Sequence, residues 1–505
     1  MRCRDVDSSL AVRGESRTSK PAAIEPARPA PAWYRDWMAL AGPLATLVLM
    51  LSGLTARPFW GDEADTISAE RRSVPQLLRL LGHVDAVHGL YYLLLWPVVG
   101  LAGPGEFAAR LPSALAMAAA AGGVTAIARR LTSRPAGLYA GLVFALLPMV
   151  TRQAHNARPY ALVTAAAVLA SYLLPGVAQR PTPRRLACYA AALVLVGYLQ
   201  MFGLLLIPAH AVALAGLAGD SRRAVVRRWL ASAGAASLAV APVAILGWLE
   251  RSQISWIPQP GWHDAGDLVA TLLAGTAAAA MALALLGLAG LARGGRLGWL
   301  AGPWLLLPPL LLVVLSEIKP VYNGRYLTFC LPAVALLAGA GLAALPRPAA
   351  IVALAATTSL LLPTLWALRA PDGGMRAVAQ FLRAEERPGD AIAYPGHAIP
   401  PWYLAYPDGF AQLRDISLAR TGAALGHLYA STVPRPVLDR RERGVRRIWV
   451  VQTAPGQDPA GYLAPGFRLA HEWRLAGGTT DVWLYTKARP GVVTPRPGFC
   501  LGQLA

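Results

Sequence analysis

The segment Leu90-Tyr-Tyr-Leu-Leu-Leu-Trp-Pro-Val-Val-Gly-Leu-Ala102 is apolar throughout but short, and it contains Pro97 and Gly100. A helix that crosses a bilayer needs roughly 17 to 25 apolar residues, whereas runs of roughly 10 to 14 are more often interfacial. The side of the membrane on which every later loop lies depends on whether this segment crosses it.

The composition of the chain is that of a polytopic α-helical membrane protein. Hydrophobic residues make up 55% and charged residues 15% of its 505 residues, and the mean hydropathy is +0.43. A soluble domain does not need such a profile, whereas several spanning helices do. Outside 90–102, apolar runs lie at about 37–56, 109–128, 136–152, 160–175, 186–201, 203–218, 229–248, 268–291, 298–315, 326–344 and 349–368.

Arginines in the short loops orient the chain. The net charge of +20 would also fit nucleic-acid binding, but these arginines fall between apolar runs, which is typical of membrane orientation. If 90–102 is interfacial, they share one side with the basic segment 1–35: Arg129, Arg130, Arg134, Arg180, Arg184, Arg185, Arg222, Arg223, Arg227, Arg228, Arg293, Arg296 and Arg347. We therefore predict eleven spans, within a range of about 11 to 13, in the plasma (inner) membrane. Residues 1–35 would form a disordered cytoplasmic tail, and the C-terminus would be extracytoplasmic.

The loops predicted to be external carry the unusual chemistry. The acidic pair Asp62-Glu63 lies in Arg57-Pro-Phe-Trp-Gly-Asp-Glu-Ala-Asp65, directly after the first apolar run. Because a carboxylate beside a bilayer is costly, this pair indicates a functional site, with a solvated loop as the plainer alternative. The four cysteines are far apart and indicate neither a disulfide framework nor a thiolate metal site.

Five motifs resemble, in order and spacing, those of the GT-C superfamily of membrane glycosyltransferases. They are Trp60-Gly-Asp-Glu-Ala-Asp65, His88-Gly-Leu-Tyr-Tyr92, Glu106-Phe-Ala-Ala-Arg-Leu-Pro-Ser113, Ala157-Arg-Pro-Tyr160 and Gly324-Arg-Tyr326. They look most like the bacterial family 39 type, which is similar to protein O-mannosyltransferases and to the enzyme that adds aminoarabinose to lipid A. The chain differs from that pattern at Gly89, in a motif that often reads His-Pro-Pro-Leu, and at Asn156, where Glu is common.

The resemblance implies a transmembrane catalytic domain over residues 36–370, with its first external loop at 57–108. It implies transfer of a sugar from a polyprenyl-phosphate donor to an acceptor hydroxyl of a glycan, lipid or protein on the outer side. Mannose is the first guess for the sugar. No Gly-rich phosphate loop follows a strand, so a nucleotide-sugar donor is not expected. A divalent cation at Asp62 and Glu63 is left open, and no other cofactor is expected.

The residues present suit that chemistry. The enzyme must deprotonate the acceptor hydroxyl and neutralise the departing phosphate. We predict Asp62 as the general base and Glu63 as the group that orients the acceptor or an ion. Four cations predicted on the outer side are candidates for the phosphate: Arg110, Arg158, Lys319 and Arg325. For Lys319 a snorkelling or solvated role is equally open.

The motifs add four candidates for substrate binding: His88, Tyr92, Tyr160 and Tyr326. No metal-ligand spacing accompanies His88, so interfacial packing or a hydrogen bond to the backbone is the plainer interpretation of this residue. Tyr92, together with Tyr91 and Trp96, fits a membrane-interface belt as well as a sugar pocket.

Residues 371–505 differ in kind from the rest. Their periodicity predicts a helix over 375–385 and strands over 391–394, 447–451 and 482–485. We predict a small extracytoplasmic α/β domain, which either helps to bind the acceptor or serves as a structural lid.

Two other classes of function compete with a glycosyltransferase. A lipid or sugar transporter or flippase would also be polytopic, but the chain has no evident internal repeat and few ionisable residues within its apolar runs. A catalytically inactive membrane scaffold would not need Asp62. We therefore predict the glycosyltransferase.

Overall fold

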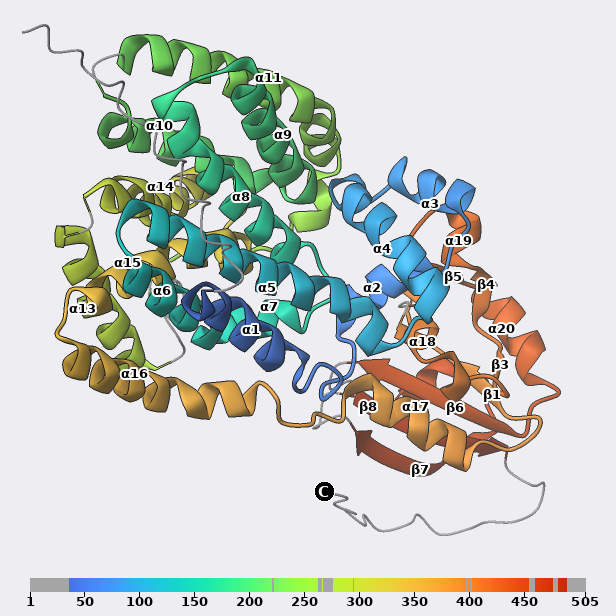
Figure 1. Ribbon diagram of the computed structural model, residues 1–505. Coiled ribbons are helices and arrows are strands. Elements are labelled where there is room, and N and C mark those ends of the chain that lie inside the picture. Colours follow the sequence, from blue (N-terminus) through green and yellow to red (C-terminus); the bar gives the residue numbers. More distant parts are fainter. Residues whose placement is uncertain are drawn as a thin grey trace, which may run out of the picture.

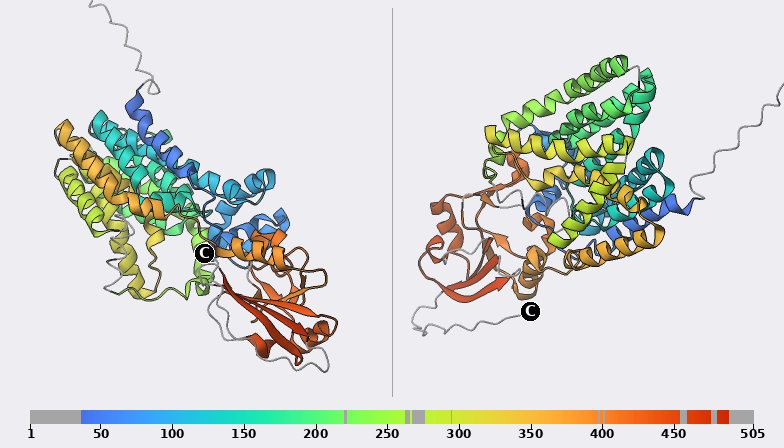
Figure 2. Two further views of the ribbon diagram at one scale, coloured as in Figure 1. Left: turned by 90° about the horizontal axis from the view of Figure 1, so that it is seen from below. Right: turned by 90° about the vertical axis from the view of Figure 1, so that its left-hand side faces the viewer.

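The computed structural model describes residues 36–219, 222–261, 266, 276–293, 295–396, 398–399, 402–453, 459–475 and 480–487. The predicted tail 1–35 lies outside these residues. A bundle of helices forms one part of the molecule and a sheet with short helices forms the other, with helices α2 to α4 between them (Figure 1). Figure 2 shows this arrangement from two further directions.

Each predicted apolar run falls on a helix where the structure describes it. The bundle helices are α1 (Trp37–Leu51), α5 (Glu106–Leu131), α6 (Arg134–Leu146), α7 (Pro148–Ala154), α8 (Tyr160–Gln179), α9 (Pro183–Leu199), α10 (Leu206–Leu217), α11 (Arg222–Leu249), α13 (Ala277–Arg293), α14 (Arg296–Ile318), α15 (Leu331–Ala343) and α16 (Arg347–Ala367). The short 3-10 helices η3 (Met201–Leu205), η4 (Arg251–Ile254) and η5 (Gly324–Cys330) lie at their ends.

Six of the described helices are long and apolar enough to cross a membrane. A seventh span results if α6 and α7, which meet at 63°, form one broken helix. The break lies at Leu147, because a residue before proline is driven out of the helical region, and its ψ is 121°. The chain is therefore a multi-pass membrane protein, while the count of eleven spans stays a prediction. The remaining apolar helices are shorter, among them 86–102, which we expect to be interfacial.

Glycines let the bundle helices approach one another closely. A Cβ added at Gly42 of α1 would lie 2.7 Å from Cα of Gly141 in α6, and one at Gly290 of α13 would lie 1.9 Å from the carbonyl oxygen of Leu337 in α15. In a bilayer, where the lipid is as apolar as the helices, such close packing drives association. These contacts hold α1 against α6 and α13 against α15 in the bundle.

The acidic pair lies on a helix within the predicted external segment 57–108. The segment forms α2 (Gly61–Glu70), α3 (Val74–Leu81), η2 (Ala86–His88) and α4 (Gly89–Ala102). Asp62 and Glu63 occupy the first turn of α2, where the backbone N–H of Trp60 donates to Oε2 of Glu63 at 3.4 Å. Acids are favoured there because the first N–H groups of a helix are unpaired and carry partial positive charge.

The C-terminal part contains two small sheets. The helix and strands expected from the sequence are present as α17 (Gly374–Glu385), β1 (Ala391–Ala393), β6 (Arg447–Thr453) and β8 (Thr480–Lys487). The larger sheet has the order β3-β1-β6-β8-β7, with β1 parallel to both of its neighbours and β6, β8 and β7 antiparallel. The smaller sheet has the order β2-β5-β4. The other elements are β2 (Ala398–Ile399), β3 (Arg414–Asp415), β4 (Leu418–Arg420), β5 (Ala430–Thr432), β7 (Phe467–Leu475), α18 (Trp402–Ala405), α19 (Gly422–Leu425) and α20 (Arg435–Glu442), with η6 (Pro407–Gly409) and η7 (Pro459–Tyr462).

One apolar cluster joins the C-terminal part to the segment that carries the acids. It includes Phe59, just before α2, and Ile67 of α2. From the C-terminal part it includes Val378 of α17, Trp449 of β6 and Val482 of β8. The domain boundary near residue 370 stays a prediction, and residues from both sides of it share this cluster. The C-terminal part is held directly against α2.

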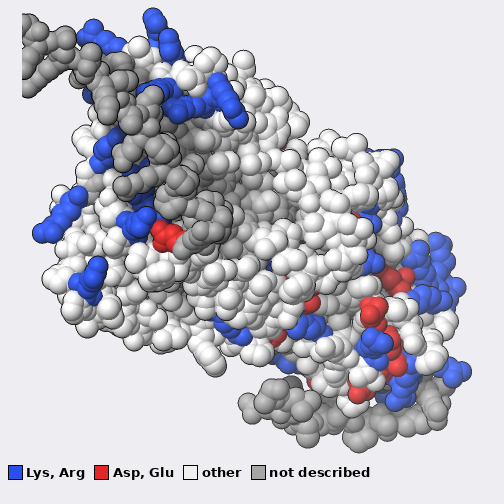
Figure 3. Space-filling view, in the orientation of Figure 1, with Lys and Arg blue, Asp and Glu red and all other residues white. Residues whose placement is uncertain are grey.

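Charged side chains are distributed unevenly over the visible surface. Figure 3 shows Lys and Arg at the end of the bundle that is far from the sheets and again around the C-terminal part, with an almost uncharged surface between them. An uncharged band of this kind suits contact with the hydrocarbon core of a bilayer.

The predicted orientation can be tested by cysteine labelling in intact cells. In a parent with its four cysteines replaced by Ser, we expect cysteines at Gln259 and Asp408 to react with an impermeant thiol reagent, because both lie on the side assigned to the outside. Cysteines at Thr132 and Thr182 should react only after the cells are opened. The reverse pattern would mean that 90–102 spans the membrane.

Candidate active site

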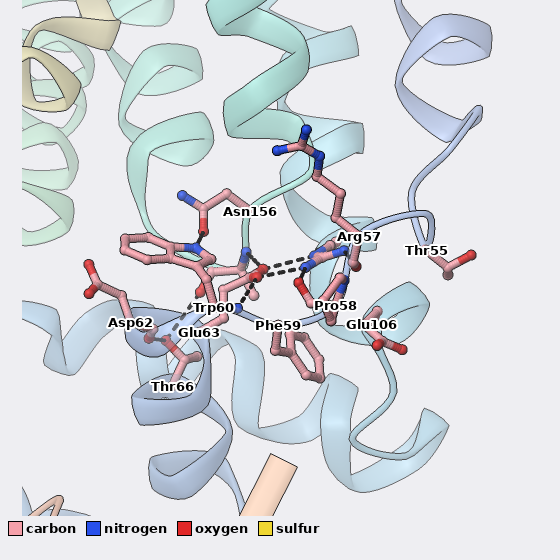
Figure 4. A network of polar contacts seen from close by, with 12 residues as sticks. Thr55, Arg57, Pro58, Phe59, Trp60, Asp62, Glu63, Thr66, Glu106 and Asn156 are labelled. Carbon is pink, nitrogen blue, oxygen red and sulfur yellow. Dashed lines mark hydrogen bonds and ion pairs between the residues drawn. The ribbon is translucent and has the colours of Figure 1, made fainter. Parts of the chain in front are cut away.

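Glu63 and Arg110 form a buried ion pair at the start of α2. Nε and Nη2 of Arg110 donate to Oε1 and Oε2 of Glu63 at 2.8 and 2.6 Å, and the two residues are 1% and 0% exposed. The backbone N–H of Ala157 also donates to Oε1, at 2.7 Å. Figure 4 shows how these bonds converge on Glu63. The pair joins α2, α5 and the segment before α8.

Arg110 has no donor left for a substrate phosphate. Its other three N–H groups donate to the carbonyl oxygens of Leu54, Arg57 and Pro58, at 2.9, 2.8 and 3.0 Å. A guanidinium has five N–H donors, and here all five are used within the protein. We therefore assign Arg110 and Glu63 to holding this corner of the fold, in place of the phosphate-binding and acceptor-orienting roles predicted from the sequence.

Asp62 points away from Glu63 (Figure 4). Its Oδ2 accepts a hydrogen bond from Nη1 of Arg325 at 2.7 Å, and the side chains of Asp62 and Arg325 remain 30% and 20% exposed. No residue that the structure describes donates to Oδ1 of Asp62. The Arg325 guanidinium also lies 5.1 and 5.8 Å from the ring centroids of Trp60 and Trp256, where their π faces attract a cation. Asp62 is thus an accessible carboxylate with one oxygen uncommitted.

Arg158 links Asp62 to the motif around His88. Its Nη1 donates to the carbonyl oxygen of Asp62 at 3.3 Å, and its Nη2 lies 2.9 Å from Nε2 of His88. Nδ1 of His88 lies 2.6 Å from Oδ1 of Asp85, and the hydroxyl of Tyr92 donates to Oδ2 of the same carboxylate. Because a guanidinium can only donate, Nε2 of His88 accepts and its Nδ1 carries the proton that is donated to Asp85. His88 and Tyr92 therefore position Arg158 in this structure.

Asp85 belongs to this network but was not among the residues predicted from the sequence. It is 7% exposed and adopts a positive φ of 65°, which is uncommon for any residue but glycine. Burial by itself would raise the pKa of Asp85, but the hydrogen bonds from His88 and Tyr92 and the positive charge of Arg158 outweigh it and hold that pKa below its usual range. Its position three residues before His88 is the only signal that the sequence offered.

Aromatic rings flank Arg325 on the bundle side. The ring of Tyr326 stacks on Phe202 at 5.3 Å between centroids and lies 6.4 Å from the ring of Tyr160. Tyr160 is 3% exposed, so it supports Tyr326 more than it presents a surface of its own. The structure thus brings together seven of the predicted residues: Asp62, His88, Tyr92, Arg158, Tyr160, Arg325 and Tyr326.

Lys319 lies apart from this group, and Arg152 lies close to it. Nζ of Lys319 donates to the carbonyl oxygen of Arg251 and lies over the ring of Trp248, so it borders η4. Arg152, on α7, was not among the predicted site residues. It is exposed, forms no hydrogen bond or ion pair with the described residues, and is subject to the charge of Arg325. It is a cation near Arg325 for which the described residues provide no hydrogen-bond or ion-pair partner.

Asp65 lies one turn after Asp62 on α2. Burial raises its pKa to about 7, the charges of Asp85 and Asp62 act in the same direction, and Arg158 opposes them. Asp65 is therefore partly protonated near neutral pH, which lessens its repulsion of Asp62.

The pair Asp62 and Glu63 does not fit a shared divalent cation. Both oxygens of Glu63 accept hydrogen bonds from Arg110, and the Asp62 side chain points the other way. Among the residues that the structure describes, no three His, Cys, Asp or Glu side chains are grouped so that they could hold a metal ion. An ion placed between these two acids would therefore find no free ligand on Glu63.

Asn156 takes a structural role at the position where the related motif often has Glu. Its Oδ1 accepts a hydrogen bond from Nε1 of Trp60 at 3.1 Å (Figure 4). Its Nδ2 donates to Gln153, and its carbonyl oxygen accepts from Ser113. This fixes the Trp60 ring, over which Arg325 lies.

Comparisons with known proteins bear on the fold. The family model described as dolichyl-phosphate-mannose-protein mannosyltransferase matches residues 90–248. Two crystal structures of ArnT from Cupriavidus metallidurans, in the apo state and bound to undecaprenyl phosphate, match with a TM-score of 0.58 each. The identities are 14% and 15%, and both matches cover 89% of this chain and 98% of ArnT. The chain has a GT-C fold.

The resemblance predicted from the five motifs is thereby confirmed. The match to ArnT covers most of this chain, whereas the family match begins after Asp62. No curated protein matches the chain in sequence.

Proposed function

We propose that this GT-C protein is a glycosyltransferase that moves a sugar from a polyprenyl-phosphate donor to an acceptor hydroxyl on the outer side of the plasma (inner) membrane. The observation that carries the proposal is the exposed carboxylate of Asp62 in contact with Arg325, where the bundle meets the C-terminal part. The structure of ArnT bound to undecaprenyl phosphate supports a lipid-phosphate donor. In the proposed orientation the N-terminus is cytoplasmic and the C-terminal part is extracytoplasmic.

In the proposed reaction Asp62 acts as the general base through its uncommitted Oδ1. The acceptor oxygen forms a bond to the anomeric carbon of the sugar while the bond from that carbon to the phosphate oxygen breaks. The hydroxyl proton passes to Asp62, and the phosphate leaves on the lipid with the electron pair of the broken bond. General-base catalysis and stabilisation of the leaving group would both lower the barrier of this transfer.

Arg325 and Arg152 are the residues we propose for the donor phosphate. Arg325 is a partly exposed cation bonded to Asp62, and Arg152 is an exposed cation near Arg325 that has no hydrogen-bond or ion-pair partner among the described residues. Arg325 is bound to Asp62 in the structure, so an incoming phosphate would compete for the same guanidinium. Donor binding would then weaken the hold of Arg325 on the carboxylate and make Asp62 a stronger base.

A transfer assay on purified protein tests the proposal. Polyprenyl-phosphate sugars, with mannose first, should lose their sugar to an acceptor or to water, and a chelator should leave this rate unchanged. A protein that moves labelled lipid or sugar across proteoliposomes, with the donor bond intact, would instead be a transporter or flippase.

Replacing Arg325 with Ala should weaken donor use by about 1.5 to 3 kcal/mol, the contribution of a charge-assisted hydrogen bond. Arg325→Lys should recover only part of this loss, because a point charge cannot reproduce the two-pronged guanidinium. The measurement is the donor KM and kcat/KM. Lys319→Ala is the matched control, since Lys319 lies against η4 and should leave both parameters unchanged. Equal donor kinetics in all variants would remove Arg325 from the phosphate site.

A further inference from the structure

A polar pocket lies where α11, the α3–η2 connection and the C-terminal part meet. It has a volume of about 360 Å³, within the range of roughly 300 to 1,000 Å³ that is usual for small-molecule sites. Its walls are 82–84 of the α3–η2 connection, Leu246, Leu249 and Glu250 at the end of α11, Ser252 and Gln253 of η4, and His427 after α19. None of the residues proposed for the reaction lines this pocket.

Four polar groups in the pocket have no partner among the described residues. Nδ1 of His83 bonds to the carbonyl oxygen of Arg79 and must donate to it, so Nε2 of His83 is a free acceptor. Nδ1 of His427 accepts from the backbone N–H of Tyr429, so its Nε2 carries a free donor. Oε1 of Gln253 and the hydroxyl of Ser252 are also uncommitted. The pocket therefore offers both donors and acceptors.

The pocket is joined to the reaction centre at two places. On one side the backbone N–H of Ala86 donates to Oε2 of Glu250 at 3.0 Å, which ties the pocket wall to the residue after Asp85. On the other side the ring of Tyr429 lies 6.0 Å from that of His427. Tyr429 is 38% exposed, and burial together with the charges of Asp65, Asp62 and Asp85 raises its pKa. Tyr429 thus lies next to the pocket residue His427 and within reach of the charges of Asp62, Asp65 and Asp85, and the carbonyl oxygen of His427 accepts a hydrogen bond from Arg72 just after α2.

We propose that this pocket binds the saccharide portion of the acceptor, with a sugar ring in the pocket and the reacting hydroxyl carried past Tyr429 towards Asp62. The proposal rests on the glycosyl transfer proposed above. It gives the C-terminal part a direct role, because His427 and Tyr429 both belong to it.

The chemistry of the lining favours a sugar over other occupants. Each sugar hydroxyl both donates and accepts, which matches the mixed set of free groups, and an exposed aromatic ring suits the C–H face of a sugar. The carboxylate of Glu250 in the wall would repel a phosphate, so this is not a second donor site. Leu246 and Leu249 form an apolar edge on the bundle side, which suits an acceptor held at the membrane surface.

The test is two-substrate kinetics with fluorescently labelled di- and trisaccharides as acceptor probes and Ser/Thr-rich peptides as the alternative acceptors. We expect transfer to the saccharides, and we expect Gln253→Ala and His427→Ala each to raise the saccharide KM by roughly 2- to 12-fold, the effect of one neutral hydrogen bond. The donor KM and the slow hydrolysis of donor by water should not change. The backbone oxygen of His427 that accepts from Arg72 is kept in His427→Ala, so the fold should be preserved.

Gln259→Ala and His471→Ala are the matched controls, since both side chains are exposed and lie outside the pocket. They should leave the saccharide KM unchanged. An unchanged KM in the pocket variants, or transfer to peptides or water with no transfer to any saccharide, would overturn the saccharide site while leaving glycosyl transfer intact. A protein that consumes no donor at all would overturn the proposed function and this site together.

Discussion

Replacing Asp62 with Asn should lower the rate of sugar transfer by about 10²- to 10⁴-fold, the range expected when a general base is lost. The substitution keeps the size of the side chain and its hydrogen-bonding shape but removes its basicity. The measurement is kcat at saturating donor and acceptor. Lipid-phosphate binding should survive and become somewhat tighter, because Arg325 would no longer be held by a charged partner. Thermal stabilisation of the protein by undecaprenyl phosphate measures that second effect.

Asp408→Asn is a suitable control for Asp62→Asn. Its side chain is 87% exposed and lies in the C-terminal part, so it should leave transfer unchanged. An Asp62→Asn protein that inserts, binds the lipid phosphate and transfers sugar at nearly the parental rate would return the acidic pair to a structural role. A catalytically inactive scaffold would transfer no sugar either before or after the substitution.

Replacing Arg110 with Met should destabilise the protein by about 3 to 5 kcal/mol, because Glu63 would be left as a buried charge without a partner. The carbonyl oxygens of Leu54, Arg57 and Pro58 would lose their donors as well. Thermal unfolding of the purified protein should show a clear fall in Tm. Adding Glu63→Gln to Arg110→Met should restore part of the loss, since the unpaired charge is then removed.

The ion pair of Arg376 and Glu106 provides a matched comparison. Its distance of 2.8 Å is similar, but its side chains are 30% and 16% exposed. Solvent weakens such a pair, so Arg376→Met should cost much less than Arg110→Met. Equal losses for the two substitutions would mean that burial does not account for the role of Arg110.

The resemblance to GT-C proteins and the positions of the helices followed from local features of the sequence. Apolar runs and arginine-bearing loops are visible without any contact information, since each run must bury its own backbone hydrogen bonds in the lipid. The motifs around Asp62, His88, Arg158 and Arg325 also pointed to residues that meet in the structure.

The roles within that group were not visible in the sequence. Asp62 and Glu63 are adjacent and chemically alike, yet α2 turns one towards Arg325 and the other towards Arg110. Judged from the sequence alone, Arg110 and Arg325 are equally good candidates for binding a phosphate. The structure separates them, because one guanidinium uses all five donors in the protein and the other keeps an exposed face.

Hydropathy and charge act locally along the chain, so the sequence was enough to predict a chain that crosses a membrane many times and to locate its acids and cations in a few segments. Which acid is free, and that Asp85 belongs to the site, became evident only from contacts between distant segments. The same holds for Arg152 near Arg325 and for Tyr429 within reach of the charges of Asp62 and Asp65. Hydrogen bonding and burial depend on neighbours brought together by folding, and each donor can be used only once.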